Sequence, residues 1–251
     1  MDKDRIAEHR NFLKDSLRQT INFRFTDQHQ GVPAPPIQKP HRPEQELIKL
    51  PARETWAAFR GTDLLEAIAN RKSHRRFKKD ALTLAELSFL LWSTQGIKKE
   101  LAPGTAVRTV PSAGCRHAFE TYLLVSHVED LEQGLYRYLP LEHALILERK
   151  DEDLVEKLTP ATLGQAFISA APVTFVWSSI PYRTEWRYTT AAHRVILMDV
   201  GHVCQNLYLA CEAISCGTCA VAAYHQELMD QILDVDGNDE FTVYLAPVGK
   251  C

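Results

Sequence analysis

The stretch HRVILMDVGHVCQNLYLACEAISCGTCAVAAY, residues 193–224, decides the fold that we expect for this chain. Its apolar residues recur at helical spacing on two adjoining stripes, which leave little of the helix for water. Such a helix must be covered by other elements, so it should be the central helix of the domain or of a dimer. Gly217 stands where a left-handed C-terminal cap would lie, and residues 218–223 predict a strand after it. A flat ligand could then lie against this small-residue backbone.

The composition limits the classes of protein to which this chain can belong. The chain has 251 residues, 45% hydrophobic and 24% charged, enough to bury a sizeable core. Its net charge of -3 gives no reason to expect nucleic acid or an anionic membrane as a partner. The N-terminus is charged from its second residue, and no apolar run reaches the roughly 20 residues of a membrane span. Six cysteines in mostly apolar contexts suit reduced thiols, so we expect a cytoplasmic protein.

The chain divides into an arm and a domain. In residues 1–59 we expect a short amphipathic helix carrying Ile6, Leu13, Leu17 and Ile21, followed by a proline-rich arm at 28–51 that wraps a neighbour or the chain's own core. Residues 60–251 mix helices with strands rather than alternating them. This pattern indicates an α+β fold, with helices packed on a mixed or antiparallel sheet.

Several elements of the domain are predicted by local signals. Thr83 and Glu86 have the spacing of a capping box before a helix that ends at Gly96. A hairpin with its turn near Pro140, a strand at 173–180 and a polar, aromatic loop at 181–194 precede the central helix. Other predicted elements are a helix capped by Thr62, a strand at 120–128, short helices at 154–158 and 161–170, a helix at 227–233 and a strand at 241–245.

The sequence RKSHRR, residues 71–76, places four permanent cations and a hydroxyl just after a helix. Forked guanidinium groups and an ammonium working together would hold an anionic group such as a phosphate ester. A solvated basic face is the competing interpretation.

Three further features have two interpretations each. In RTVPSAGCRH, residues 108–117, the small residues let backbone amides approach a ligand, although the motif is weak alone. His202 is either a proton donor or a hydrogen-bonded core histidine. Cys216 and Cys219 form a C-x-x-C, which fits a redox dithiol or two small residues in a tight turn. No second cysteine pair or histidine pair stands at zinc-finger spacing, so we expect no metal site.

Eight motifs in register resemble the FMN-dependent nitroreductase superfamily, and within it the SagB-type dehydrogenases associated with azole-forming peptide modification. They run from about residue 60 to 250 and are RKSHRRF, LSFLLWSTQGI, PSAGCRHAFETYLLV, GLYRYLPLEHAL, EWRY, DVGHVCQNLYLA, CGTCAVAAY and YLAPVGK. The resemblance implies an intertwined homodimer that holds FMN at the subunit interface.

The resemblance also implies roles for particular residues. Arg71, Lys72, Ser73 and Arg75 would belong to the FMN site, where the two arginines and the serine meet the phosphate, ribityl chain and pyrimidine edge. The remaining implied flavin contacts are Pro111, Ser112, Ala113 and Gly114 from the partner subunit, Gly217, Thr218 and Cys219 along the ring near N5, and Lys250 near the phosphate.

One pair departs from the family. Azoline-oxidising members resemble one another in a Lys-Tyr pair before the central helix, where this chain has Arg187 and Tyr188. Arginine stays charged, so a proton-transferring lysine has no equivalent here. We expect hydride exchange between flavin N5 and a small organic or peptide-derived substrate, with Tyr188 and Arg187 as candidate catalytic residues. NAD(P)H and oxygen remain open as electron donor and acceptor, and the alternative is a flavin-binding partner subunit with little turnover of its own.

Overall fold

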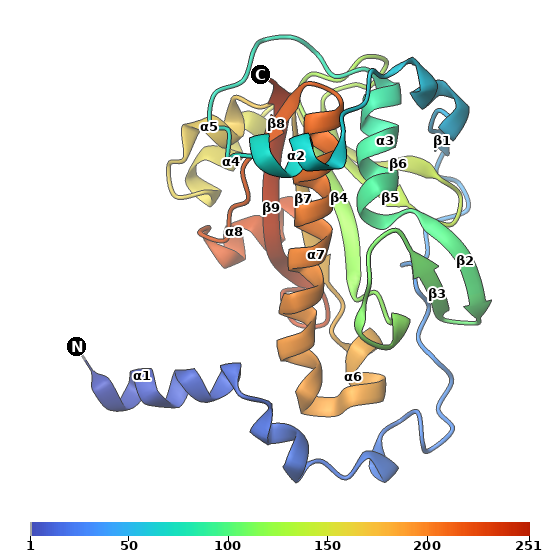
Figure 1. Ribbon diagram of the computed structural model, residues 1–251, viewed down its shortest axis with the longest axis vertical. Coiled ribbons are helices and arrows are strands. Elements are labelled where there is room, and N and C mark those ends of the chain that lie inside the picture. The colour runs from blue at the N-terminus through green and yellow to red at the C-terminus, as the bar shows by residue number, and fades with distance from the viewer. Residues whose placement is uncertain (1) are drawn as a thin grey trace.

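The computed structural model describes residues 2–251, which form an α+β fold around one antiparallel sheet, as predicted (Figure 1). The sheet has seven strands, and neighbouring strands pair in antiparallel orientation. From edge to edge the strands are β1 (Ile48–Lys49), β6 (Ala144–Lys150), β5 (Gly134–Leu139), β4 (Phe119–Val125), β7 (Val173–Ser179), β9 (Phe241–Lys250) and β8 (Cys216–Thr218). A separate hairpin pairs β2 (Ile97–Ala102) with β3 (Thr105–Arg108).

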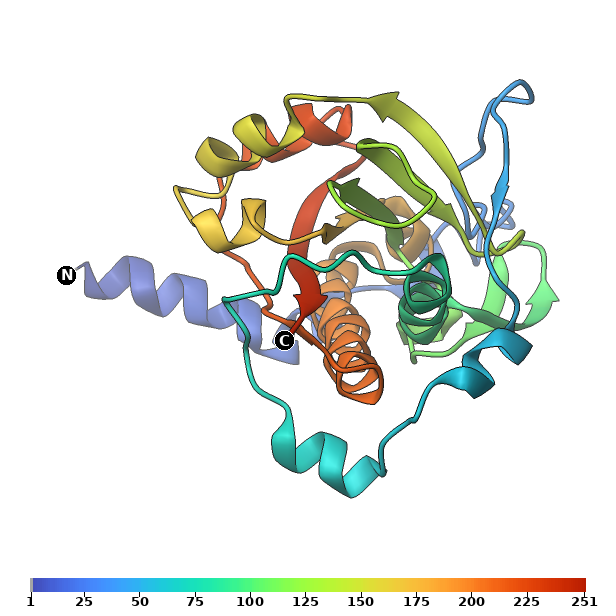
Figure 2. The same cartoon turned by 90° about the horizontal axis from the view of Figure 1, so that it is seen from above.

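Helices cover both faces of the sheet (Figure 2). One face packs against α3 (Leu84–Gln95) and the central helix α7 (Ala192–Ala213). The other face packs against α4 (Leu154–Ala161), α5 (Ala166–Ser169) and α8 (Gln226–Leu233). Strand β4 shows the two-residue period directly, because Leu123 lies in the first core and Leu124 in the second.

Several local predictions are confirmed. The Thr83 hydroxyl accepts the backbone N–H of Glu86, and the Glu86 carboxylate accepts that of Thr83, which completes the capping box of α3. Gly96 ends this helix. Strands β5 and β6 form the predicted hairpin, with Pro140 in the connection between them.

The segment before the central helix was wrongly predicted to be a loop. It contains helix α6 (Tyr182–Tyr188), which starts after Pro181, a residue whose φ of -58° suits a helix start. The helix was missed because its polar and aromatic residues show no apolar period. The prediction also missed the β2–β3 hairpin, whose turn contains Gly104 at a φ of +70°.

The turn after α7 differs from its prediction. Ser215, with a φ of 56°, takes the left-handed position expected for Gly217, and Gly217 lies within β8. The predicted strand at 218–223 is confirmed only in part. Strand β8 ends at Thr218, the Ala220 N–H donates to the Tyr208 hydroxyl, and Val221 returns to the sheet as a single antiparallel bridge to Leu245 of β9.

The predicted N-terminal amphipathic helix is shorter than expected. Helix α1 (Lys3–Arg10) buries no residue, and Lys14 breaks the helical path with an extended conformation at φ -91° and ψ 145°. Leu13 and Leu17 follow in 3-10 turns and are exposed. Figure 1 shows α1 reaching away from the body of the domain.

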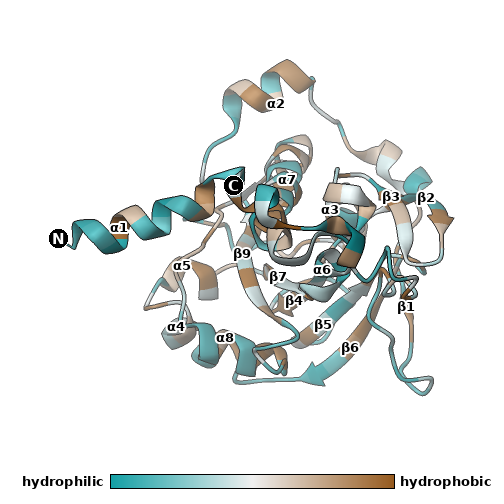
Figure 3. Cartoon of the chain, turned by 90° about the horizontal axis from the view of Figure 1, so that it is seen from below, coloured by the Kyte–Doolittle hydropathy of each residue, from teal (hydrophilic) through white to brown (hydrophobic). Residues whose placement is uncertain are grey.

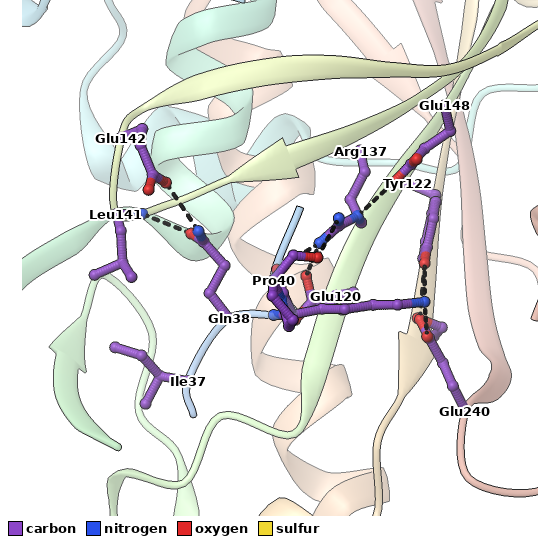
Figure 4. A network of polar contacts seen from close by, with 12 residues as sticks. Ile37, Gln38, Pro40, Glu120, Tyr122, Arg137, Leu141, Glu142, Glu148 and Glu240 are labelled. Atoms are coloured by element: carbon purple, nitrogen blue, oxygen red, sulfur yellow. Dashed lines mark hydrogen bonds and ion pairs between the residues drawn. The ribbon is translucent and has the colours of Figure 1, made fainter. Parts of the chain in front are cut away.

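The proline-rich arm crosses the second face of the sheet at residues 37–40 (Figure 4). The buried Arg137 donates to the carbonyls of Lys39 (2.8 Å) and Pro40 (3.0 Å) and pairs with Glu148 at 2.6 Å. Gln38 donates to Glu142 at 2.8 Å and accepts the Leu141 N–H at 3.0 Å. The arm is therefore held both through its backbone and through side chains, which include Gln38, Lys39 and Gln45.

A buried carboxylate, Glu120, joins the arm to α6. It accepts the Lys39 N–H at 2.7 Å and the Arg183 guanidinium at 2.5 Å, and Arg137 lies 3.6 Å away. Burial alone would raise the pKa of Glu120, but Arg183 and Arg137 lower it below its usual value. The carboxylate therefore stays ionised inside the fold.

Replacing Arg183 should destabilise the fold strongly. The change Arg183→Met removes a cation that neutralises the buried Glu120, and a broken buried ion pair typically costs about 3 to 5 kcal/mol. Urea unfolding would measure the loss. The exposed Arg42→Gln is the matched control, with an expected change within about 0.5 kcal/mol. A loss below about 1 kcal/mol for Arg183→Met would contradict this account of Glu120.

Candidate functional site

The end of α7 gathers three parts of the chain around one phenol. The Tyr208 hydroxyl lies 2.9 Å from the Ser73 hydroxyl and accepts the Ala220 N–H at 2.8 Å. The His74 N–H donates to the Thr218 carbonyl at 2.9 Å, so the basic segment runs alongside β8 as an added bridge. The structure therefore brings the basic segment and the small-residue turn together, as their predicted roles require.

Gly217 is a position of close approach. A Cβ built on it would lie 2.4 Å from the Cys251 sulfur and 2.5 Å from Cγ of His74. The neighbouring Thr218 is buried and donates its hydroxyl to the Pro247 carbonyl at 2.9 Å. Packing around this part of β8 leaves no space for a larger residue.

Three cations of the basic segment, Arg71, Lys72 and Arg75, are not neutralised by carboxylates of residues 2–251. Arg71 lies over the Tyr208 ring at 5.1 Å and Arg75 over the Phe167 ring at 5.8 Å. Within the described part of the chain, neither arginine nor Lys72 forms an ion pair with a carboxylate. Lys250 differs, because its ammonium pairs with Glu86.

A second cluster surrounds the PSAG turn, residues 111–114. Asp199 on α7 accepts the Ala113 N–H at 3.0 Å, and the Ser112 hydroxyl accepts the His117 N–H at 2.9 Å. Burial raises the pKa of Asp199, although hydrogen bonds from Ser112 and Ala113 oppose the rise. The Asp199 carboxyl therefore attaches the PSAG turn to α7.

The candidate catalytic pair lies against the same turn. A Cβ on Gly114 would lie 2.7 Å from the Tyr188 hydroxyl and 3.1 Å from Nε of Arg187. Gly114 also has a φ of 60°, which favours glycine. The Arg187 guanidinium lies 5.4 Å from the centre of the Tyr188 ring.

The two clusters occupy different stretches of α7. Asp199 binds the PSAG turn, and Tyr208 binds the basic segment. Tyr208 follows Asp199 by nine residues in the sequence. At about 1.5 Å per residue, these anchors lie roughly 14 Å apart along the helix. One chain therefore holds the two clusters well apart.

The thiols and His202 fall outside this chemistry. Burial raises the pKa of Cys216 to about 12, so its thiol is protonated at neutral pH. Cys219 is buried too, which favours the tight-turn interpretation over the dithiol. The prediction of a core position for His202 is wrong, because His202 is exposed on α7. In the described part of the chain no group of His, Cys, Asp or Glu could hold a metal ion.

Sequence reasoning missed three residues that organise these clusters: Tyr208, Asp199 and Arg116. Tyr208 was interpreted only as an apolar position of the central helix, and Asp199 only as a polar one. Arg116 is buried, lies 4.7 Å from the Trp186 ring and donates to the Arg183 carbonyl at 2.9 Å. The available signal was an arginine directly after the small residues of the PSAGC sequence.

Comparison with known proteins identifies the family. Residues 68–250 match the Nitroreductase family, so the chain belongs to it. A protein of Methanocaldococcus jannaschii named "Putative nitroreductase MJ1384" is 34% identical over 187 residues, covering 74% of this chain and 90% of that protein.

Solved structures share the fold. The crystal structure of a "putative nitroreductase" from Ralstonia eutropha JMP134 has a TM-score of 0.67 at 24% identity, over 87% of this chain and 94% of that one. Another, from Exiguobacterium sibiricum 255-15 and in complex with FMN, has a TM-score of 0.55 at 13% identity, over 76% of this chain and 89% of that one. Residues 2–251 contain no helix long and apolar enough to cross a membrane.

The close approach at Gly217 gives a test. The change Gly217→Ala should cost about 1 to 3 kcal/mol of stability, because the new methyl group must displace His74 and Cys251. Chemical denaturation would measure this cost. Ala222→Ser, at an exposed position beyond the turn, should change stability by less than about 0.5 kcal/mol. Equal stability of the two variants would show that His74 and Cys251 can move aside at little energetic cost.

Proposed function

We propose that this chain is an FMN-dependent oxidoreductase that exchanges a hydride between flavin N5 and a small organic or peptide-derived substrate. The observation that carries the proposal is the basic segment, whose unpaired cations lie beside the turn at Gly217. Membership of the Nitroreductase family supports it, as does the FMN bound to the Exiguobacterium protein.

The residues fit the chemistry of FMN. Arg71, Lys72 and Arg75 supply positive charge without carboxylate partners, which suits a phosphate group. The Ser73 hydroxyl adds a neutral polar group suited to the ribityl chain. Lys250 would reach a phosphate only by leaving Glu86, so it contributes least to the proposed site. When bound, FMN supplies the hydride donor and acceptor at N5.

The exposed side of α7 supports a homodimer. Leu197 is 50% exposed and Met198 46% exposed, one turn before Gly201. A Cβ on Gly201 would meet nothing within 4 Å, so nothing in this chain explains a glycine inside a helix. The separate helix α2 (Leu64–Asn70) also exposes apolar residues, seen as brown bands in Figure 3. A second copy covering these surfaces would bring its PSAG turn to the basic segment of the first.

Arg187 and Tyr188 are the proposed groups at the substrate. The Tyr188 hydroxyl is a donor and acceptor beside Gly114, and Arg187 fixes a positive charge there. NAD(P)H is the proposed electron donor, with oxygen as the alternative electron acceptor. We also propose placement near the SagB-type dehydrogenases. The arginine in place of the family lysine favours the second candidate function, a flavin-binding subunit of a peptide-modification complex.

The flavin proposal is tested by absorption. Purified protein incubated with FMN and then desalted should keep the flavin spectrum, and a colourless protein would contradict the proposal. Rapid turnover of a nitroaromatic or quinone with NAD(P)H would favour the oxidoreductase, whereas a reducible flavin without turnover would favour the partner subunit.

The role of Arg75 is tested separately. Arg75→Ala should weaken FMN binding roughly 10-fold to 100-fold, because charge-assisted hydrogen bonds to an anion contribute about 1.5 to 3 kcal/mol. Equilibrium dialysis would give the dissociation constants. Arg76→Ala removes the same charge one residue away and should change binding far less. Equal effects of the two changes would indicate a solvated basic face.

The dimer is tested at Gly201. Gly201→Arg should raise the dimer dissociation constant at least about 30-fold, the equivalent of roughly 2 kcal/mol, while the monomer stays folded. Analytical ultracentrifugation would measure the constant. Gln231→Arg, on the exposed side of α8, is the control. A wild-type monomer, or an unchanged constant for Gly201→Arg, would contradict the proposed interface.

A further inference from the structure

Two guanidinium groups beside the PSAG turn have no carboxylate to neutralise them. Arg116 donates to the carbonyls of Arg183 and Pro35 and to the hydroxyl of Thr105. Among residues 2–251, neither Arg116 nor Arg187 forms an ion pair. Both guanidinium groups therefore keep an uncompensated charge beside the turn, although the chain as a whole has a net charge of -3.

The neighbouring carboxyl groups are each engaged with another partner. On α6, Arg183 is neutralised by Glu120, and Glu185 is engaged with His193 at 2.7 Å. Asp199, the carboxyl group bound to the turn itself, accepts the Ala113 N–H. Burial lowers the pKa of Arg116, and the positive charge of the nearby Arg187 lowers it further.

Arg187 is the accessible member of this pair. It is partly exposed, whereas Arg116 is only 1% exposed and fully engaged. Its Nε and the Tyr188 hydroxyl both pack against the backbone of Gly114, so the guanidinium and the phenol lie beside the same turn. A planar carboxylate matches a guanidinium in shape and charge and could accept from both groups.

We propose that the substrate of this site carries a carboxylate, which Arg187 binds and thereby selects over neutral molecules of the same shape. The proposal rests on the proposed function, because it assigns a substrate class to the same flavin site. Arg116 is a positioning residue here, since it donates to the Arg183 carbonyl near the start of α6 and stacks on Trp186 beside Arg187. Arg187 then has a binding role that a proton-transferring lysine would not fill.

The test compares 4-nitrobenzoate with 4-nitrobenzamide, two probes of nearly equal size that differ in charge. Isothermal calorimetry on the flavin-loaded protein would give both dissociation constants, and flavin content would be measured first. The wild type should bind the carboxylate at least about 10-fold more tightly than the amide. Arg187→Gln should bring this ratio close to one without weakening amide binding, and Arg187→Lys should restore part of the preference.

Arg42→Gln is the matched control, because it removes the same charge from an exposed position on the arm. It should leave the preference intact, and high salt should reduce the preference of the wild type. A loaded wild type that binds both probes equally, or binds neither, would overturn the proposal and leave the flavin function standing. Equal weakening of both probes by Arg187→Gln would show a merely structural role. A protein that takes up no FMN would end both proposals.

Discussion

The neutralisation of Glu120 is the interaction on which the rest of the structure depends. A carboxylate with only 2% of its surface exposed is tolerable only if cations and N–H donors surround it. Arg183 comes from α6, Arg137 from β5 and the N–H from Lys39 of the arm, so one charge joins three distant segments. Helix α6 carries Arg187 and Tyr188 from the same anchor, and the position of the candidate catalytic pair follows from this buried charge.

Positive charge is distributed differently on the two faces of the sheet. On the arm side, Lys39 pairs with Glu240 at 2.5 Å and Arg137 with Glu148. On the α7 side, Arg71 and Arg187 lie over aromatic rings instead. A cation over a ring keeps most of its capacity to bind an anion, because the ring offers no full negative charge. The proposed FMN and carboxylate sites both use cations of this kind.

The sequence was sufficient where one local signal governed the structure, as in the capping box at Thr83, the hairpin near Pro140 and the long helix before Ser215. It was insufficient where tertiary contacts decided. Helix α6 has no apolar period, and its anchor Glu120 lies more than 60 residues earlier, so it was expected as a loop. For the site, the grouping of Ser73 with Thr218 was predictable only through family resemblance, and the role of Tyr208 depends on two distant hydrogen bonds.

The length of α7 has a consequence for how this protein can change. Because the helix holds the PSAG turn at Asp199 and the basic segment at Tyr208, a residue inserted between them would turn the second cluster by about 100° and shift it by about 1.5 Å. The arm and the surface loops tolerate added residues at little cost. We therefore expect variation in length to accumulate at the ends of the chain and in its loops, while the nine-residue spacing within α7 stays fixed.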